Sequence, residues 1–165
     1  MNPPDERLGH LDARGRARMV DVGGKPVTER DAVARARVVM SPATASALVE
    51  GRLPKGDALA VARVAGIMAA KQTPQLVPLC HGVTLVAVSV DVDVDAPGGV
   101  ATVTAAVRAA DRTGVEMEAL VAASIAALAL YDMVKALERG VVVERVELVS
   151  KTGGVHGDWQ RREGG

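Results

Sequence analysis

Four ionisable residues stand at the two ends of one apolar stretch of the sequence. Glu116 and Glu118 open it, Asp132 and Lys135 close it, and residues 119–131 carry no charge. On a helix Asp132 and Lys135 are i and i+3, so they share a face and could act as an acid/base pair or form a solvated ion pair. At about 1.5 Å per residue, Glu118 and Asp132 lie about 21 Å apart on one helix. If both ends do chemistry, they belong to two halves of a site, and the other half must come from another chain.

Further candidate residues stand in short, irregular segments. Lys55 lies in LPKGD, where a rigid turn can present a fixed cation to a phosphate, although a loop lysine is usually only solvated. Cys80 and His81 follow a proline in VPLCHG, and a small buried thiol and a satisfied boundary histidine are the alternatives to a role in a site. The segment GGKPVTER lacks the upstream glycine of a Walker motif, so we assign it no role as a phosphate loop.

Composition excludes several classes of protein. Twenty basic residues balance twenty acidic ones among 165, so no overall field attracts nucleic acid or anionic lipid, and with no Phe, one Trp and one Tyr there are no stacking platforms for single strands. One cysteine excludes an internal disulfide, and histidines at positions 10, 81 and 156 do not have metal-ligand spacing. We therefore expect no metal site.

The hydropathy pattern predicts one cytoplasmic domain covering residues 1–165. The N-terminus has no apolar run of the kind a signal peptide needs. The longest charge-free run has 13 residues, whereas a membrane span needs roughly 20, so we expect residues 119–131 to form a buried core helix. Residues 1–20 and 152–165 are charged or rich in glycine, and we expect both ends to be flexible.

The first half of the chain predicts a strand and two helices. Residues 29–40 alternate with period two, with Ala32, Ala34 and Ala36 on one face and Val33, Arg35 and Arg37 on the other. Ser41 and Pro42 supply the N-cap and first turn of a short helix that Gly51 ends. Asp57 begins a second helix, which we expect to stop before Pro74.

The second half predicts a hairpin, a long helix and a last strand. Two alternating segments flank APGGV, which is typical of an antiparallel hairpin. Thr113 and Glu116 have the spacing of a capping box that begins the apolar helix, and Gly140 is expected to end it before the strand VVVERVELV.

This order, β-α-α-β-β-α-β, predicts an α+β fold: a ferredoxin-like split βαβ sandwich, with an antiparallel sheet and helices on one face. The other face, carrying Val88, Val90 and Val92 or their neighbours, would need a cover, and a second chain is the simplest one.

Several long motifs together resemble a known family. They are MVDVGGKPVTERDAVARARVVMSP, LPKGDALAVARVAGIMAAKQTPQLVPLCH and RTGVEMEALVAASIAALALYDMVKALERG, followed by SKTGG, in this order from about residue 10 to residue 154. They resemble the MoaC family, the cyclic pyranopterin monophosphate synthases of molybdenum cofactor biosynthesis. Motifs of this length that agree at once are far more specific than any short pattern above.

The resemblance implies a lyase that converts cyclised dihydro-GTP (3′,8-cyclo-7,8-dihydroguanosine triphosphate) to cyclic pyranopterin monophosphate and releases pyrophosphate. It implies a homohexamer, a trimer of dimers, with active sites at subunit interfaces, and neither nucleic acid nor membrane as a partner. No cofactor is expected, and whether magnesium accompanies the triphosphate is left open. The alternatives are a non-catalytic ferredoxin-like sensor of purine or pterin ligands and an enzyme of this fold acting on another purine or pterin triphosphate.

The resemblance also implies roles for residues of this chain. By similarity Asp132 and Lys135 are the acid/base pair and Lys55 is a second catalytic cation, because rebuilding a purine-derived ring needs proton transfers and a triphosphate needs cations. The implied substrate-binding residues are Leu79, Cys80, His81, Glu116, Met117, Glu118, Lys151 and Arg30.

The sequence departs from the family pattern at two places. Gly82 replaces the usual proline after the Cys-His pair, which loosens the turn that holds His81. Val155 and His156 stand where a second basic residue usually follows the glycines, which puts one phosphate contact in doubt.

Overall fold

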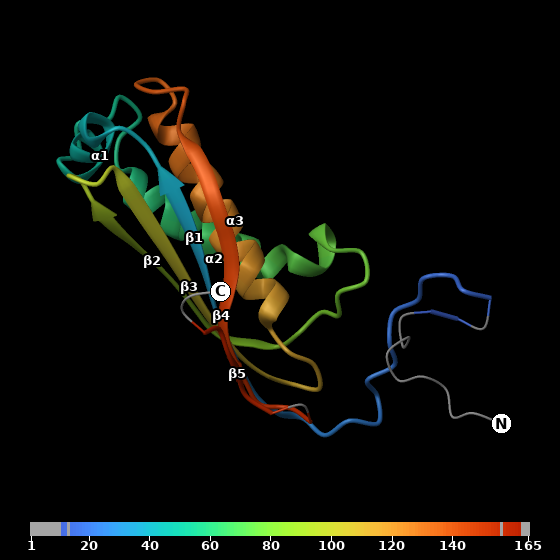
Figure 1. Ribbon diagram of the computed structural model, residues 1–165. Coiled ribbons are helices and arrows are strands. Elements are labelled where there is room, and N and C mark those ends of the chain that lie inside the picture. The colour runs from blue at the N-terminus through green and yellow to red at the C-terminus, as the bar shows by residue number, and fades with distance from the viewer. Residues whose placement is uncertain (1–10, 13, 156, 163–165) are drawn as a thin grey trace.

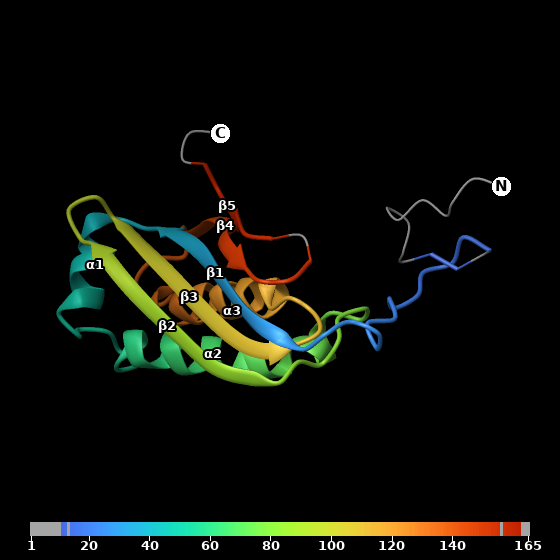
Figure 2. The same cartoon turned by 90° about the horizontal axis from the view of Figure 1, so that it is seen from below.

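The computed structural model describes residues 11–12, 14–155 and 157–162. Its elements are β1 (Thr28–Val39), α1 (Pro42–Val49), α2 (Ala58–Leu76), β2 (Leu85–Asp95), β3 (Val100–Asp111), α3 (Glu116–Val134), β4 (Val142–Thr152) and β5 (Trp159–Gln160). The strands form one antiparallel sheet in the order β2-β3-β1-β4-β5, and α2 and α3 lie across one face of it (Figures 1 and 2). The predicted α+β, ferredoxin-like fold is confirmed, and β5 is an addition that the sequence did not predict.

Small side chains fill the layer between the sheet and the helices. Ala32, Ala34 and Ala36 of β1 are buried, as the period of two predicted. Gly66 of α2 lies so close to α3 that an added Cβ would be 2.9 Å from the carbonyl oxygen of Ala122. The helices can therefore pack closely, and a core without phenylalanine is still filled.

Helix α3 is the core helix that the sequence predicted. Among the described residues it is the one helix long and apolar enough to cross a membrane by length and composition, but half of it is buried inside the fold. Its fully buried residues include Ala119, Ala126 and Leu130, which belong to the hydrophobic core. Burial against the sheet and α2 accounts for its apolar composition.

Both predicted ends of α3 are wrong. Its N-cap is Val115, with no side-chain cap, because Glu116 forms an ion pair with Lys151 of β4 in place of a capping box. The helix ends at Val134, well before Gly140. Beyond it, the Glu138 carboxylate accepts hydrogen bonds from the N–H (2.9 Å) and hydroxyl (2.8 Å) of Ser41, so a tertiary contact redirects the chain.

Helix α2 also departs from the prediction, because it continues through Pro74 to Leu76. Pro74 has no backbone N–H and so removes one helical hydrogen bond, but only two further residues of α2 follow it. The N–H of Val77 still bonds to the carbonyl oxygen of Thr73 and closes the helix.

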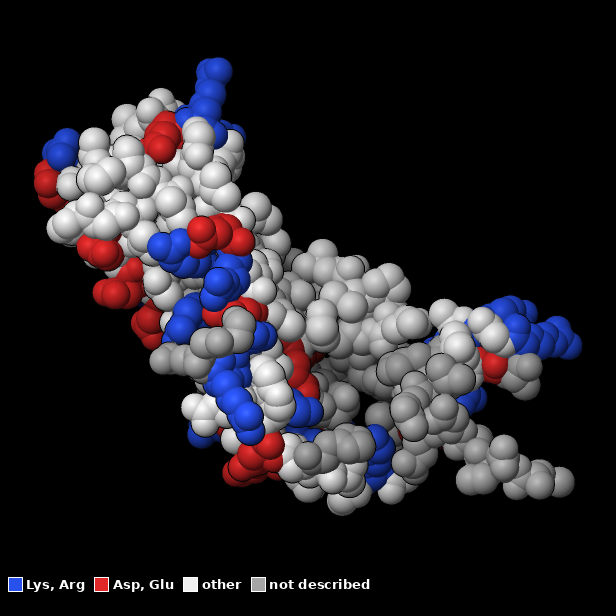
Figure 3. All heavy atoms as spheres, viewed as in Figure 1, with Lys and Arg blue, Asp and Glu red and all other residues white. Residues whose placement is uncertain are grey.

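The prediction that the valines of β2 lie on the uncovered face is wrong for those named. Val90 is 1% exposed, and its Cγ2 lies beside Gly66 of α2, while Val88 and Val92 pack against the core. The uncovered face is polar, with a hollow of about 260 Å³ lined by Arg35, Arg37, Thr102, Arg145 and Glu147. Figure 3 shows basic side chains gathered in the region of β4 and β5. An antiparallel sheet can face water on one side. Because this face is polar, exposed apolar side chains are not a reason to expect a second chain to cover it.

The two ends of the chain differ in their contacts with the rest of the fold. Described residues before β1 extend away from the sheet and helices (Figure 1). Near the other end, β5 pairs with β4, and Arg161 donates from Nε to the carbonyl oxygen of Leu148 (2.8 Å) while its guanidinium lies 5.7 Å from the Trp159 ring centre. Flexibility of residues 1–20 and 152–165 stays a prediction, and His10 and His156 lie outside the described residues.

Candidate active site

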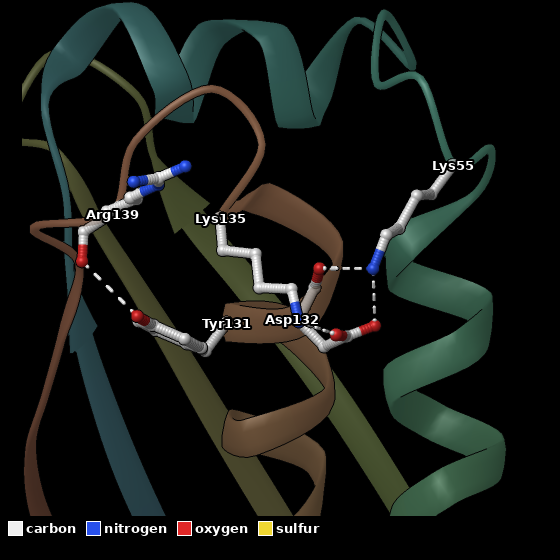
Figure 4. A network of polar contacts seen from close by, with 5 residues as sticks. All are labelled: Lys55, Tyr131, Asp132, Lys135 and Arg139. Carbon is white, nitrogen blue, oxygen red and sulfur yellow. Dashed lines mark hydrogen bonds and ion pairs between the residues drawn. The ribbon is translucent and has the colours of Figure 1, made fainter.

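Three charged residues meet at the C-terminal end of α3. The Asp132 carboxylate lies between two ammonium groups, with Oδ2 2.7 Å from Lys55 Nζ and Oδ1 2.7 Å from Lys135 Nζ (Figure 4). Lys55 Nζ also donates to the backbone oxygen of Asp132 at 2.9 Å. About half of the Asp132 side chain is exposed, so the cluster is open to a ligand.

The loop between α1 and α2 positions Lys55. Leu53 anchors it in the core, and the N–H of Gly56 closes a turn on the carbonyl oxygen of Leu53 (3.1 Å). Gly56 has a φ of +91°, a value that glycine adopts without strain. Asp57 then caps α2 by accepting from the N–H of Ala60 at 2.9 Å, so Lys55 extends from a fixed turn.

The electrostatics of this cluster are those of a strong ion pair. Hydrogen bonds from Lys135 and then Lys55 lower the pKa of Asp132 to about 2, and Asp132 raises the pKa of Lys135. The carboxylate and the Lys135 ammonium are therefore both charged at neutral pH. In this state Asp132 can accept a proton and Lys135 can donate one, but a ligand that inserts between them would have to bring the two pKa values closer to neutrality for efficient transfer.

A pocket of about 200 Å³ opens at the other end of α3. Glu116 and Lys151 face each other inside it, with Lys151 Nζ 2.7 Å from Glu116 Oε1. The charged residues that line it are Lys25, Arg30, Asp31, Arg112, Glu116 and Lys151, four cations against two anions. The excess of cations makes it a candidate site for a phosphate chain.

Arg30 is the strongest sign that this pocket takes an anion. It is 8% exposed, and among the described residues its one hydrogen bond runs from Nε to the carbonyl oxygen of Asp111 at 3.4 Å. A buried guanidinium without a carboxylate partner is unfavourable until an anion joins it. Gly153 and Gly154, at φ of +83° and +86°, pass beside it, and a Cβ on Gly154 would collide with Arg30 Nη1.

Glu118 and Cys80 form a second pair near this end of α3, in which Glu118 is buried and Cys80 is partly buried. Glu118 is 1% exposed, and the Cys80 thiol lies 3.9 Å from Oε1, while Oε2 has no partner among the described residues. Burial raises the pKa of Glu118, and burial together with Glu118 raises the pKa of the Cys80 thiol. Both pKa values are therefore shifted toward the protonated form, and a thiol with a raised pKa is unsuited to act as a thiolate nucleophile.

The remaining candidates lie near the same end. Leu79 is 40% exposed and His81 half-buried in the loop before β2, and Met117 is 37% exposed in the first turn of α3. Gly82 lies in that loop with its nearest contact a side-chain atom of Pro74, 3.9 Å from an added Cβ. A Cβ at this position would therefore make only an ordinary van der Waals contact.

Comparison with known proteins shows which proteins this chain is similar to. The model of the MoaC family matches residues 19–154. The chain belongs to the MoaC family. The protein named cyclic pyranopterin monophosphate synthase from Chloroflexus aggregans is 57% identical over 158 residues, which cover 96% of this chain and 96% of that protein. The protein of the same name from Chloroflexus aurantiacus is 55% identical over 161 residues, with 98% and 99% covered.

A third relative is much longer than this MoaC-family chain. Molybdenum cofactor biosynthesis protein 1 of Bos taurus is 54% identical over 159 residues, which are 96% of this chain and 25% of the bovine protein.

The structure sorts the predicted site residues of this MoaC-family chain into two groups. Lys55, Asp132 and Lys135 form one, and the other, at the opposite end of α3, comprises Arg30, Leu79, Cys80, His81, Glu116, Met117, Glu118 and Lys151.

Two of the four cations that line the pocket were not among the predicted site residues. Lys25 belongs to GGKPVTER, which we dismissed as a Walker motif, and Arg112 directly precedes the Thr-Gly-Val-Glu segment. In the sequence, each is a positively charged residue close to a glycine, and this was the one hint of a phosphate-binding role. Only the structure shows that both line the same pocket.

Proposed function

We propose that this chain catalyses the synthesis of cyclic pyranopterin monophosphate in molybdenum cofactor biosynthesis, from cyclised dihydro-GTP and with release of pyrophosphate. The observation that carries the proposal is more than 50% identity to proteins of that name over nearly the whole chain. The Lys55–Asp132–Lys135 cluster and the cationic pocket supply the two kinds of chemistry that this reaction needs.

The cationic pocket is assigned to the triphosphate. Arg30 lacks a carboxylate partner among the described residues, and Lys151 and Arg112 lie within the same pocket. When a hydroxyl derived from the ribose attacks the innermost phosphorus, a new P–O bond forms, the bond to the outer phosphates breaks, and the hydroxyl proton passes to a base. Fixed cations stabilise the charge that moves onto the departing pyrophosphate.

The Lys55–Asp132–Lys135 cluster is assigned to the proton transfers. Asp132 is the base and Lys135 the acid, since these are their charge states at neutral pH. Lys55 holds Asp132 through both its carboxylate and its backbone oxygen. Leu79, His81 and Met117, which are partly exposed, would contact the ring, and the partly buried Cys80 and buried Glu118 would support them.

The separation of the two groups favours active sites shared between subunits. Glu118 and Asp132 belong to one continuous helix and are about 21 Å apart along it, further than one reacting centre extends. A homohexamer built as a trimer of dimers would bring the two groups together across an interface. We further propose that the enzyme works in the cytoplasm without a resident cofactor.

The test is turnover. Purified protein given cyclised dihydro-GTP should release pyrophosphate and form the cyclic monophosphate, while Asp132→Asn should do neither at a comparable rate. Binding without turnover would support the sensor instead. Competition binding among GTP, pterins and the cyclised compound separates this substrate from another purine or pterin triphosphate.

A further inference from the structure

Asp111, the last residue of β3, connects three segments that border the candidate site. Its Oδ2 accepts a hydrogen bond from the N–H of Thr84 (2.9 Å), and its Oδ1 accepts one from the N–H of Arg112 (2.7 Å). Its backbone oxygen accepts the bond from Arg30 Nε (3.4 Å). Asp111 does not itself line the cationic pocket.

The bond to Thr84 fixes one side of the site. Thr84 ends the loop that carries Leu79, Cys80 and His81, and its carbonyl oxygen accepts from the N–H of Ala110 at 3.4 Å. Both backbone polar groups of Thr84 are thus attached to the end of β3. Gly82 makes this attachment more important, because glycine leaves the backbone of the loop more conformational freedom than other residues would.

The bond to Arg112 fixes the other side. Arg112 lines the pocket, and its Nε donates to the carbonyl oxygen of Lys25 at 3.0 Å, which joins the turn after β3 to the segment before β1. Arg112 is therefore held at its backbone by Asp111 and at its guanidinium by Lys25. Among the described residues no hydrogen bond occupies its terminal nitrogens, which could therefore bind an anion.

We propose that Asp111 is a positioning residue for the reaction: it holds the loop bearing Cys80 and His81 and the cationic pocket in a fixed mutual arrangement, and it orients Arg112 toward the triphosphate. This inference rests on the proposed function. The carboxylate suits the role because one side chain with two acceptor oxygens can bind two backbone donors at once. The same two bonds lower the pKa of Asp111, so it stays ionised at neutral pH.

The experiment compares Asp111→Ala and Asp111→Asn with Asp95→Ala. Asp95 ends β2 at the opposite end of the same hairpin and accepts one backbone bond, from the N–H of Gly98 at 3.0 Å, so it controls for the loss of a turn contact. Asp111→Ala should lower kcat/KM by about 10- to 100-fold, since misplacement of substrate-binding groups by about 1 Å has effects of that size. Asp111→Asn keeps one acceptor oxygen and should fall between Asp111→Ala and the wild type.

Two readouts separate positioning from stability. Inorganic triphosphate, used as a probe, should bind about 10-fold more weakly to Asp111→Ala than to the wild type, a loss expected for one misdirected charge-assisted contact. Amide hydrogen exchange in residues 79–84 should accelerate in that variant and not in Asp95→Ala. If Asp111→Ala does not fold, Asp111→Asn carries the same comparison.

The proposal is overturned if the Asp111 variants lose stability as Asp95→Ala does but keep triphosphate affinity and loop exchange at wild-type values. Triphosphate binding and amide exchange do not require turnover. Failure of the wild type to release pyrophosphate would therefore reject the proposed function without deciding the role of Asp111.

Discussion

Lys55 and Asp132 are in contact although 77 residues separate them in the sequence. Lys55 Nζ lies 2.7 Å from Asp132 Oδ2 and 2.9 Å from the backbone oxygen of the same residue. Because that oxygen belongs to the last turn of α3, the lysine also satisfies a helix C-terminus. This double contact fixes the α1–α2 loop against the helix and makes the Asp132–Lys135 pair a three-residue cluster.

The first prediction concerns whether Asp132 and Lys135 act as one unit. Asp132→Asn and Lys135→Ala should each lower kcat by about 100- to 10,000-fold, the range for loss of a positioned acid or base. The double variant should be scarcely slower than the slower single variant, because residues that act together are not additive. Steady-state kinetics on all three proteins measures this.

Thermal unfolding of the same proteins is the control. Both side chains are about half exposed, so loss of the ion pair should change stability little. A loss of stability that parallels the loss of rate would support a structural ion pair, and additive losses of rate would indicate two independent roles.

The second prediction concerns the two ends of α3. Glu118→Gln and Asp132→Asn should each be inactive, but chains of both kinds that are unfolded and refolded together should recover activity. If each site takes Glu118 from one chain and Asp132 from another, random pairing leaves about a quarter of the sites with neither mutation. Sites built within a single chain would always contain one mutation and would stay inactive. The mixture must be shown to contain oligomers of both chains before its activity is read.

The third prediction follows from the burial of Glu118. Burial raises its pKa, so the folded state binds a proton that the unfolded state has already released, and wild-type stability decreases as pH rises above the ordinary glutamate value of 4.5. Glu118→Gln removes this titration. The melting temperature of the variant relative to wild type should therefore rise as the pH increases from about 5, just above the unperturbed glutamate pKa.

Glu138→Gln is the matched control with the opposite sign. Hydrogen bonds from Ser41, its backbone N–H first, lower the pKa of Glu138, so its contribution is present above 4.5 and is lost as the solution becomes more acidic. The deficit of this variant should grow as pH rises toward the ordinary glutamate value of 4.5 and stay constant above it, where that of Glu118→Gln shrinks. A deficit of Glu118→Gln that stays constant over that higher range would contradict the assignment of Glu118 as a buried acid with a raised pKa.

The fourth prediction concerns the contact between α2 and α3. Gly66→Ala would place a methyl group 2.9 Å from the carbonyl oxygen of Ala122 and 3.0 Å from Val90 Cγ2. Overpacking of this kind costs about 1–3 kcal/mol, which exceeds the gain of about 1 kcal/mol in helix propensity. Denaturant unfolding should show a net loss of stability. Gly140→Ala, where an added Cβ has no neighbour within 4 Å, should leave stability close to that of the wild type.

Features that depend on neighbours along the chain could be predicted from the sequence. Ser41 caps α1 by accepting from the N–H of Thr44 at 3.3 Å, Asp57 caps α2, and the alternation of β1 buries Ala34. Caps need residues within one turn, and a strand's faces follow from its period of two. The family resemblance, carried by long motifs in order, likewise needed no structure.

Features that depend on distant partners could not be predicted in this way. Thr113 and Glu116 have the spacing of a capping box, but the Glu116 carboxylate forms an ion pair with Lys151 of β4 instead. The alternation of β2 predicts that Val90 and Asp91 point to opposite faces of the sheet, but it does not predict which of these faces the helices cover. That choice depends on the packing of α2, which is reported by the contact between Val90 and Gly66.

The sequence by itself determined the order of the elements from β1 to β4, the family and the residue types that can carry the chemistry. Only the tertiary structure decided which of these residues meet: Lys55 with Asp132, Glu116 with Lys151, and Asp111 with both Thr84 and Arg112. It also showed that Arg30 is buried without a carboxylate among the described residues. The physical reason is that spacing along the chain constrains contacts within an element, whereas side-chain contacts, burial and pKa values arise from segments that come together only on folding.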